Sequence, residues 1–341
     1  MGLLSALYGL MIARRNRRYA DGRENVHHAS LPVISVGNVS VGGTGKTPTV
    51  HAIARILQEH GYKPAIVLRG YGRSTRGARI VRTGADIEMN ARQAGDEAML
   101  HSYALQVPVV VAEKRIEGAA LVAEHTNANV IILDDGFQHR SIYRDLDVVL
   151  VNEATIADQR LLPEGRLREP LSSLERADVV ILTQNGVSEG DVRPFMRADA
   201  LLLRTRIEVR NAYSLATLAT LATIQRGVLL LDRVIAVTAI ANPERFRSSL
   251  QALSEKTALV RHIAFHDHHR FRNRNVTMMI NLARKENVRM IVTTEKDAVK
   301  LLEFAEQFSL AGIEVAVVPL RFSFDGGKTA FEQLLLQRIA R

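Results

Sequence analysis

The sequence predicts an α/β fold in which a mostly parallel sheet is covered by helices on both faces, followed by a second, smaller α/β domain. Short runs rich in Val, Ile and Leu alternate with stretches of helical periodicity along most of the chain. Runs that are apolar throughout are typical of strands buried on both faces, and their alternation with helices is typical of parallel sheets. The 341 residues are enough for two domains of ordinary size.

The first expected element is a helix within residues 1–20. The apolar run "MGLLSALYGLMI" precedes the basic cluster "ARRNRR". The run is shorter than the ~20 residues that cross a bilayer, and a secretory signal would place its basic residues first. The apolar turns would hold Leu3, Leu4, Leu7, Leu10 and Met11, followed by Arg14, Arg15, Arg17 and Arg18. Two interpretations stay open from these residues: a helix in a membrane interface, or a helix docked on the protein's own core.

The strands of the first domain are expected at 33–36, 65–68, 108–112, 130–133, 147–151 and 178–183. Between the first two lies a helical pattern, with Val50, Ile53, Ala54 and Leu57 spaced at i, i+3, i+4 and i+7. Gly61 is expected to end this helix, and Pro64 prevents its return. We therefore expect a core of residues 21–213.

The character of the chain changes near residue 214, where "SLATLATLATIQRG" contains three Leu-Ala-Thr triplets. We interpret residues 214–227 as a connection between domains. Alternation resumes with strands expected at 234–238 and 290–294 and helices at 243–253 and 297–304, and "VAVVPLRFSF" is expected to form another strand. Residues 228–341 would form the smaller domain, and the last helix could dock back on the core.

Composition narrows the classes of partner. The net charge of +9 and the pI near 10.0 suit an acidic partner, namely nucleic acid, an anionic membrane or a phosphorylated substrate. Only 5% of residues are aromatic and Trp is absent, which disfavours stacking on nucleic-acid bases. Without cysteine the chain has neither disulfides nor thiolate metal sites. We expect no nucleic-acid partner and find no sign of an obligate protein partner.

A glycine-rich segment between the first expected strand and helix predicts a phosphate site. It departs from the pattern G-x-x-x-x-G-K-[ST] only at its first position, where Ser40 stands; a negative φ there would tolerate serine. The loop consists of Ser40, Val41, Gly42, Gly43, Thr44, Gly45, Lys46 and Thr47. Backbone N–H groups and the helix amino end would cradle phosphates, Lys46 would neutralise them, and Thr47 would ligate Mg²⁺.

A second signal is the segment "NVIILDDGFQHR". The strand 130–133 delivers Asp134 and Asp135 at its carboxyl end, where nucleotide-binding sheets hold the carboxylate that binds Mg²⁺ or its waters. The alternative is an ordinary Asp-Gly turn after a strand.

The chain resembles the tetraacyldisaccharide 4′-kinases, the lipid A 4′-kinases of Gram-negative bacteria, over nearly its whole length. The resemblance rests on these segments in order: "LYGL", "VISVGNVSVGGTGKTP", "LRGYGR", "GDE", "ILDDGFQHR", "LLPEGRLREPLSSLERAD", "NPERF", "DHH" and "TTEKDAVKL". The family's own phosphate loop also lacks the first glycine. One departure is "AVTAIANPERF", where Ala239 and Ala241 stand at positions that are often glycine in the family.

The resemblance implies an activity and a setting. ATP would phosphorylate the 4′-hydroxyl of a tetra-acylated glucosamine disaccharide 1-phosphate, giving lipid IVA. It also implies two α/β/α domains with the active site between them, and an amino-terminal helix at the inner membrane. Residues 1–18 would then hold the protein peripherally on the cytoplasmic face, and the positive charge would suit an anionic membrane and an anionic glycolipid.

The resemblance further assigns a catalytic pair. Asp96 of "AGDEA" matches the aspartate that accepts the proton of the hydroxyl, and His268 of "FHDHHRF" matches its partner histidine. From the residues alone, Asp96 could simply cap a helix that starts at Glu97. His262, His266, His268 and His269 could be a solvated basic segment or a metal site. Because the family usually has no histidine at the position of His266, the cleft-facing imidazole stays open among His266, His268 and His269.

The resemblance also assigns the phosphate site. Lys46 matches the phosphate-loop lysine of the family, and Thr47 matches its Mg²⁺-binding threonine. The acidic pair of the family corresponds to Asp134 and Asp135. The supporting candidates are Glu97 at the metal and Gln138, His139, Arg115, Arg168, Glu169, Arg69 and Arg73 at nucleotide or substrate. Arg168 and Glu169 could instead form a surface ion pair of little value, and Arg69 and Arg73 could be solvated.

Two rival functions share the loop. A partitioning-type ATPase would carry a signature lysine directly before the two glycines, where Val41 stands. It would also leave Asp96 and His268 without a role. A nucleotide-dependent binding module would need Lys46 and Thr47 and would tolerate the loss of Asp96.

Overall fold

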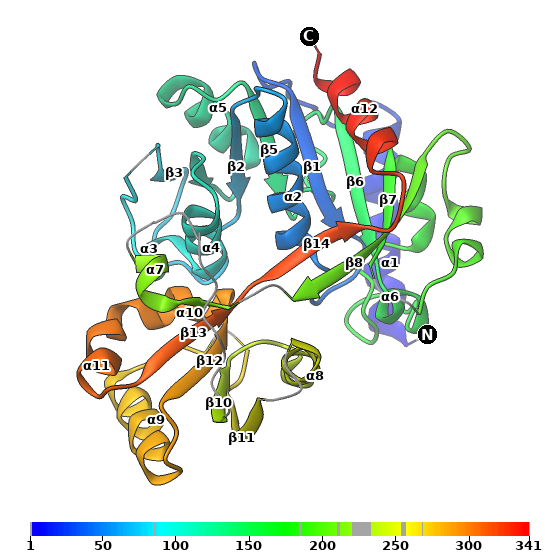
Figure 1. The fold of residues 1–341 in the computed structure, drawn as a ribbon. Helices are drawn as coiled ribbons and strands as arrows, with labels where there is room; N and C mark the ends of the chain where they lie inside the picture. Colours follow the sequence, from blue (N-terminus) through cyan, green and yellow to red (C-terminus); the bar gives the residue numbers. More distant parts are fainter. Residues whose placement is uncertain are drawn as a thin grey trace.

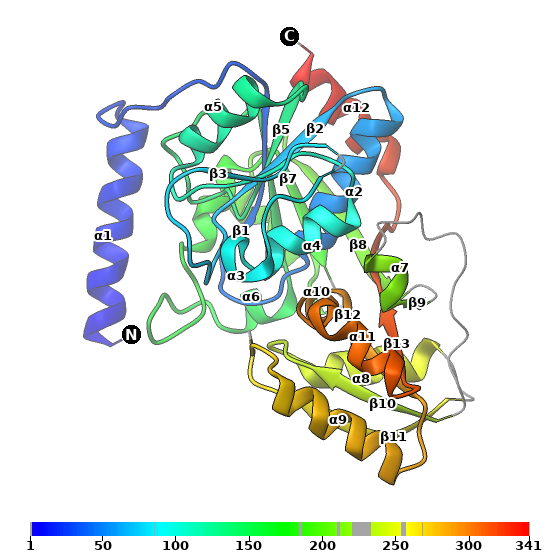
Figure 2. The ribbon, with the colours of Figure 1, turned by 90° about the vertical axis from the view of Figure 1, so that its left-hand side faces the viewer.

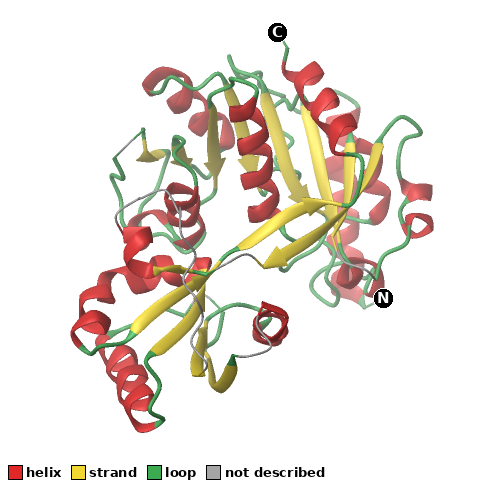
Figure 3. Ribbon diagram, viewed as in Figure 1, coloured by secondary structure: helices red, strands yellow, loops and turns green. Residues whose placement is uncertain are grey.

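The structure is a computed structural model that describes residues 2–84, 86–183, 186–209, 212–219, 233–253, 257–267 and 269–340. Its described residues form a nine-stranded sheet and a five-stranded sheet, with helices packed around both (Figure 1, Figure 3). Both sheets are mainly parallel, so the predicted α/β class is confirmed.

The large sheet has the strand order β14-β8-β7-β6-β1-β5-β2-β4-β3. Only the pairs β3–β4 and β14–β8 at its two edges are antiparallel. The strands are β1 (Val33–Asn38), β2 (Pro64–Leu68), β3 (Arg79–Arg82), β4 (Val109–Val111), β5 (Val130–Asp134), β6 (Leu146–Val151), β7 (Val179–Thr183), β8 (Leu201–Val209) and β14 (Leu320–Phe324). Because β1 and β5 are parallel neighbours with Val36 opposite Asp134, their carboxyl ends emerge side by side.

Alternate residues of the buried strands pack on helices of opposite faces. Ile34 and Val36 of β1 join one apolar cluster with α2 (Lys46–Glu59), α4 (Asp96–Ala104) and α12 (Lys328–Ile339). Val33 joins another with α5 (Arg115–His125), and a third contains the 3-10 helix η1 (Leu171–Arg176). The remaining short helices of this part are α3 (Ala91–Ala94), α6 (Glu153–Ala157), η2 (Glu189–Asp191) and η3 (Arg193–Phe195). This alternation accounts for strands that are apolar on both faces.

The smaller sheet has the strand order β11-β10-β12-β13-β9, with only β9 antiparallel. Its strands are β9 (Tyr213–Ser214), β10 (Arg233–Thr238), β11 (Ala258–Ala264), β12 (Met290–Thr294) and β13 (Glu314–Val318). The helices are α7 (Leu215–Ala219), α8 (Pro243–Leu253), α9 (Asn273–Lys285), α10 (Glu295–Leu301), η4 (Leu302–Phe304) and α11 (Ala305–Leu310). Ala298 of α10 belongs to the same apolar cluster as Ala98 of α4, so the two sheets share buried contacts.

The segment 315–324 is not one strand, and this prediction was wrong. Pro319 separates β13, in the smaller sheet, from β14, which pairs with β8 in the large sheet. Proline lacks the N–H that a continuous strand needs. The chain then forms α12, whose Arg338 pairs with Asp178 beside β7 at 3.0 Å.

Strands β3, β8, β9 and β11 were not predicted either. β3 lies at an edge and β11 shows only partial burial, so neither has the continuous apolar pattern that identified the central strands. Part of the expected connection 214–227 is helical, since Leu215–Ala219 forms α7; residues 220–232 lie outside the described part.

Helix α1 (Leu3–Ala20) lies at the side of the core, and one of its faces is docked (Figure 2). Ser5 and Ile12 are buried, and the Ser5 hydroxyl donates a hydrogen bond to the carbonyl of Leu161 at 2.8 Å. On the other side, large apolar side chains are more than half exposed, namely Leu3, Leu4, Leu7, Leu10 and Met11. Among the described helices, none has the length and apolar character to cross a membrane.

Candidate active site

The glycine-rich loop joins the carboxyl end of β1 to the first turn of α2. Gly45 precedes α2 with a φ of 95°, and Gly42 has a φ of 109°. Both conformations favour glycine. The first amides of α2 have no acceptor within the helix, and together with the helix dipole they suit an anion.

Ser40 fits this loop without strain. Among the described non-glycine residues only Asp135 and Asn287 have positive φ, so the backbone at Ser40 accepts a side chain. Its hydroxyl is buried and lies 2.8 Å from the hydroxyl of Thr155 in α6. The atypical first position of the motif is therefore tied to the fold beside it.

The far end of the loop is held at Thr44. The side-chain amide of Asn38 donates to the Thr44 hydroxyl at 2.9 Å, and the hydroxyl of Thr183, at the end of β7, donates to its carbonyl at 2.8 Å. The loop is thus anchored to two strands before Lys46 begins α2.

Asp135 follows β5 and faces two cations. Its carboxylate accepts a hydrogen bond from Arg168 at 2.7 Å and lies 3.5 Å from the Lys46 amine. Burial opposes the charged form, but Lys46 and Arg168 outweigh it and lower the pKa of Asp135 to about 2. An ordinary Asp-Gly turn, the alternative considered above, agrees with the backbone, because Asp135 has a φ of 55°. It does not explain why the Asp135 carboxylate is paired with Lys46 and Arg168.

Asp134 differs from its neighbour. Its Oδ2 lies 2.9 Å from Nε2 of His101, which is fully buried on α4. Its Oδ1 is buried and has no hydrogen-bond partner among the described residues. Oδ1 of Asp135 is likewise buried without a hydrogen-bond partner in the described part of the chain, but it lies 3.5 Å from the Lys46 amine. The two aspartates therefore differ in their neighbours: cations face Asp135, whereas a histidine holds Asp134.

The acidic pair of "GDE" lies in the first turn of α4. The residue before this helix is Gly95, and no side chain caps it, so the interpretation of Asp96 as the helix cap was wrong. The Asp96 carboxylate lies 3.9 Å from the Lys300 amine. Burial, and then the charge of Asp134, raises the pKa of Glu97. The first turn of α4 thus lies close enough to the end of β5 for the carboxylates of Glu97 and Asp134 to repel each other.

Lys300, on α10, was missed by the sequence analysis. It is almost completely buried, pairs with Asp297 at 2.7 Å and donates to the carbonyl of His269 at 3.2 Å. It links the smaller sheet to Asp96. It lies in the quoted segment "TTEKDAVKL", but neither spacing nor composition distinguishes this lysine from an exposed one.

The histidine-rich segment is described only in part. His268 lies outside the described residues. Nδ1 of His269 lies 3.0 Å from Nε2 of the exposed His266, and the His269 ring stacks on Phe265. His262 lies 2.8 Å from the Thr238 hydroxyl. In the described part of the chain, three or more His, Asp or Glu residues do not cluster as a metal site.

Arg168 and Glu169 pair with different residues, so the surface ion-pair interpretation was wrong. Arg168 binds Asp135, whereas Glu169 is fully buried and accepts bonds from Asn16, Arg176 and Arg15 at 2.8, 2.9 and 3.2 Å. One residue therefore faces the carboxylates and the next one anchors α1.

Three more candidates surround the aspartates. Arg115 is buried, donates to the carbonyl of Ala112 at 2.6 Å and has its pKa lowered to about 10 by burial, although Asp134 and Asp135 oppose this shift. Burial, and then the charge of Arg115, lowers the pKa of His139 to about 4. The Gln138 amide donates to the carbonyl of Asn38 at 2.9 Å, which joins the carboxylate loop to the phosphate loop.

The two arginines of "RGYGR" differ. The Arg73 side chain is only 3% exposed and pairs with Glu113 at 2.6 Å, so its solvated alternative was wrong. Arg69 is exposed. Arg270 donates to the carbonyl of Gly72 at 3.3 Å, which brings the smaller domain against this loop.

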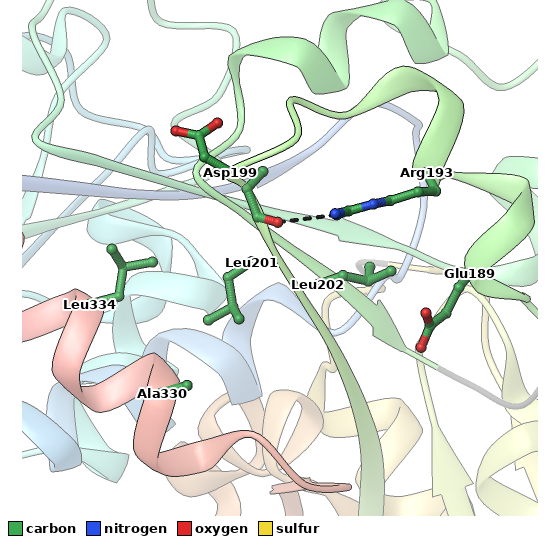
Figure 4. A pocket seen from close by; sticks show the side chains of 8 residues that line it. Glu189, Arg193, Asp199, Leu201, Leu202, Ala330 and Leu334 are labelled. Carbon is green, nitrogen blue, oxygen red and sulfur yellow. Dashed lines mark hydrogen bonds between the residues drawn. The ribbon is translucent and has the colours of Figure 1, made fainter.

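A cavity of about 540 Å³ lies elsewhere, between β8 and α12. Figure 4 shows Leu201 and Leu202 with Leu334 and the polar residues Glu189 and Asp199 along it, and Arg193 bonded to a backbone oxygen. None of the candidate residues above lines this cavity.

Comparison with known proteins identifies the family. The sequence profile of the family described as tetraacyldisaccharide-1-P 4′-kinase matches residues 1–340. The chain belongs to this family. Membership makes it a kinase of lipid A biosynthesis, an ATP-dependent phosphotransferase that acts on a hydroxyl group, as the sequence predicted.

Individual relatives agree with this family. The tetraacyldisaccharide 4′-kinase of Desulfotalea psychrophila is 38% identical over 311 residues, 90% of this chain and 89% of the relative. That of Chlorobaculum tepidum is 36% identical over 340 residues, 97% of this chain and 95% of the relative. The crystal structure of the "apo" form of LpxK from Aquifex aeolicus in complex with ATP matches with a TM-score of 0.79 and 29% identity. It covers 98% of this chain and 97% of that one.

Proposed function

We propose that this chain transfers the γ-phosphoryl group of ATP to the 4′-hydroxyl of a tetraacyl glucosamine disaccharide 1-phosphate, giving lipid IVA. The observation that carries the proposal is that three features lie together at the carboxyl ends of the central strands of the large sheet. Lys46 of the phosphate loop faces Asp135, directly after β5, and Asp134, the last residue of β5, repels Glu97 of α4. This combination of cation, carboxylate pair and acidic helix start suits phosphoryl transfer.

The phosphate loop would bind ATP. The connection between β1 and α2 contains Ser40, Val41, Gly42, Gly43, Thr44 and Gly45, and Lys46 and Thr47 begin α2. The loop amides and the amino end of α2 would hold the phosphate oxygens, and Lys46 would move from Asp135 toward the triphosphate.

The residues present fit a magnesium ion. The unpartnered Oδ1 of Asp134, with Thr47 at the start of α2, supplies the oxygen donors that Mg²⁺ prefers beside phosphates. Glu97 and Asp135 would complete the negative surroundings. Bound there, the ion would neutralise charge on the phosphate oxygens.

Asp96 would take the proton of the 4′-hydroxyl. The hydroxyl oxygen bonds to the γ-phosphorus, the bond from that phosphorus to the β–γ bridging oxygen breaks, and the proton passes to the Asp96 carboxylate. Lys300 of α10 lies 3.9 Å from this carboxylate. His268 is proposed as the histidine partner.

The anionic substrate would meet the surrounding basic residues. The cationic candidates are Arg115, Arg168, Arg69 and Arg73. His139, whose pKa is lowered to about 4, would contact the substrate as a neutral hydrogen-bonding group. Gln138 and Glu169 would hold the site in shape. Residues 1–18 would keep the protein peripherally on the cytoplasmic face of the inner membrane, where the glycolipid lies.

The test supplies ATP labelled at the γ-phosphate, magnesium and the tetraacyldisaccharide 1-phosphate in detergent. We expect the label in the lipid, and none with Lys46→Ala. Label released only as inorganic phosphate would contradict the proposal and favour the partitioning-type ATPase. ATP bound tightly without turnover would also contradict it and favour a binding module.

A further inference from the structure

Two buried histidines connect helix α2 to the carboxylate at the end of β5. Nε2 of His51, on α2, lies 3.0 Å from Nδ1 of His101, on α4. Nε2 of His101 lies 2.9 Å from Oδ2 of Asp134. His51 is 2% exposed and His101 is fully buried, so water does not compete for these contacts. Neither histidine belongs to the machinery proposed above.

The geometry determines which atom carries the hydrogen facing Asp134. A bare Nε2 of His101 would place a lone pair against a carboxylate oxygen, which is repulsive at this distance. Nε2 therefore carries the hydrogen, and it donates to Asp134. Burial, and then the neighbouring His101, lowers the pKa of His51 well below its ordinary value, which leaves His51 neutral and suited to pair with Nδ1 of His101.

The other oxygen of Asp134 shows what this arrangement achieves. Oδ1 is buried and has no hydrogen-bond partner among the described residues, whereas Oδ2 is held by His101. A hydrogen bond to one oxygen restricts the rotation of the carboxylate, and this limits the directions in which its second oxygen can point. A buried, unpartnered carboxylate oxygen is costly unless a cation or water satisfies it.

We propose that His101 is a positioning residue that orients Asp134 toward magnesium or its waters, and that His51 keeps His101 in the orientation and proton arrangement this requires. The proposal rests on the proposed function only in assigning a metal to Asp134. It gives a purpose to two imidazoles that occupy buried helix positions otherwise suited to apolar side chains. Partners that orient a metal ligand typically contribute ~10–100-fold in metal affinity.

The test is a titration of Mn²⁺ into the enzyme bound to a non-hydrolysable ATP analogue, followed by electron paramagnetic resonance. His101→Leu removes the donor, and we expect Mn²⁺ to bind ~10–100-fold more weakly. His101→Gln returns an N–H near the position of Nε2, and we expect it to recover most of this loss. His51→Leu should weaken binding by a smaller factor, and His51→Gln should restore it.

Met99→Ala is the matched control. Met99 is also buried on α4 but belongs to the apolar cluster, so its truncation should lower thermal stability without changing Mn²⁺ affinity. The proposal is overturned if folded His101→Leu binds Mn²⁺ as the unmodified enzyme does, or if His101→Gln is as weak as His101→Leu. Should His101→Leu fail to fold, equal affinities for His51→Leu and His51→Gln would overturn it.

The outcomes separate this proposal from the proposed function. An unmodified enzyme that binds Mn²⁺ and nucleotide but transfers no phosphate to the glycolipid contradicts the function alone. An active kinase that binds Mn²⁺ equally well with and without the His101→Leu substitution contradicts only the role of the histidines.

Discussion

Single residues in this site are distinguished by their surroundings rather than by their type. Lys46 and Arg168 lower the pKa of Asp135 to about 2, whereas burial and Asp134 raise that of Glu97. The Asp135 carboxylate is already compensated by the charges of Lys46 and Arg168. The Glu97 carboxylate gains most from a cation placed between it and Asp134, and we therefore propose the metal between Glu97 and Asp134.

His139 makes stability depend on pH. Its pKa in the folded protein is about 4, below the ordinary 6.5, so the unfolded chain takes up a proton first as the pH falls. The free energy of unfolding should therefore decrease between pH 6.5 and 4, with a slope of up to ~1.4 kcal/mol per pH unit from this group. Urea unfolding across this range should show a shallower decrease for His139→Gln.

Other groups also titrate between pH 4 and 6.5, so the informative quantity is the difference between unmodified protein and variant. His125→Gln, at a side chain that is 54% exposed, is the matched control and should leave the slope unchanged. Equal slopes for the unmodified protein and His139→Gln would contradict the expectation.

At the scale of elements, Glu169 joins α1 to the core. Its buried carboxylate accepts hydrogen bonds from Arg15 and Asn16 of α1 and from Arg176 at the end of η1. The backbone beside it is also involved, since the Tyr8 hydroxyl donates to the carbonyl of Arg168 at 3.0 Å. One carboxylate thus connects the first helix to the loop whose Arg168 binds Asp135.

Glu169→Gln should lower the free energy of unfolding by roughly 3 kcal/mol, because it leaves two arginines without their buried counter-charge. Glu164→Gln tests the same connection at an exposed position, where Glu164 accepts from the Gly2 amide at 2.6 Å. It should cost less than about 0.5 kcal/mol in urea unfolding. Similar losses for both variants would show that Glu169 is not the anchor.

At the scale of the whole molecule, the two sheets meet where α4 packs near α10. Helix α1 lies at the side of the core (Figure 2), and its large apolar side chains are exposed. Arg270 contacts the loop at Gly72, and Lys300 lies beside Asp96. The site therefore depends on both parts of the chain. The division into residues 21–213 and 228–341 stays a prediction, and β14 and α12 show that the last segment returns to the large sheet.

The exposed face of α1 should bind membranes. Replacing Leu7 and Leu10 by Ser removes apolar area that would enter the interface, and we expect binding to anionic vesicles in a sedimentation assay to weaken by ~10-fold or more. Leu310→Ser is the control, because that leucine is 82% exposed on another helix. Unchanged vesicle binding by the double variant would refute a membrane role for this face.

The central fold was predictable because its strands are apolar on both faces, and because glycines and prolines mark their ends. Strands β3 and β11 were not predicted because they are partly exposed and lack a continuous apolar run. The prediction of one strand at 315–324 was wrong because Pro319 interrupts it, and the chain passes there from the smaller sheet to the large sheet.

The site was predictable where a local motif carries the chemistry, as in the phosphate loop and the Asp134–Asp135 pair. Lys300, His101 and His51 act through contacts between distant segments, and no local pattern marks them. The separate roles of Arg168 and Glu169 likewise depend on tertiary partners that the sequence does not reveal.

The proton acceptor is the central claim, and Asp96→Asn tests it most directly. The measurement is the single-turnover rate of phosphoryl transfer from ATP to the tetraacyldisaccharide 1-phosphate, with ATP affinity determined separately. We predict a rate lower by ~10²-fold or more with ATP binding unchanged, because the amide keeps the shape of the side chain but cannot accept the proton. A variant that transfers phosphate at the unmodified rate would contradict the account.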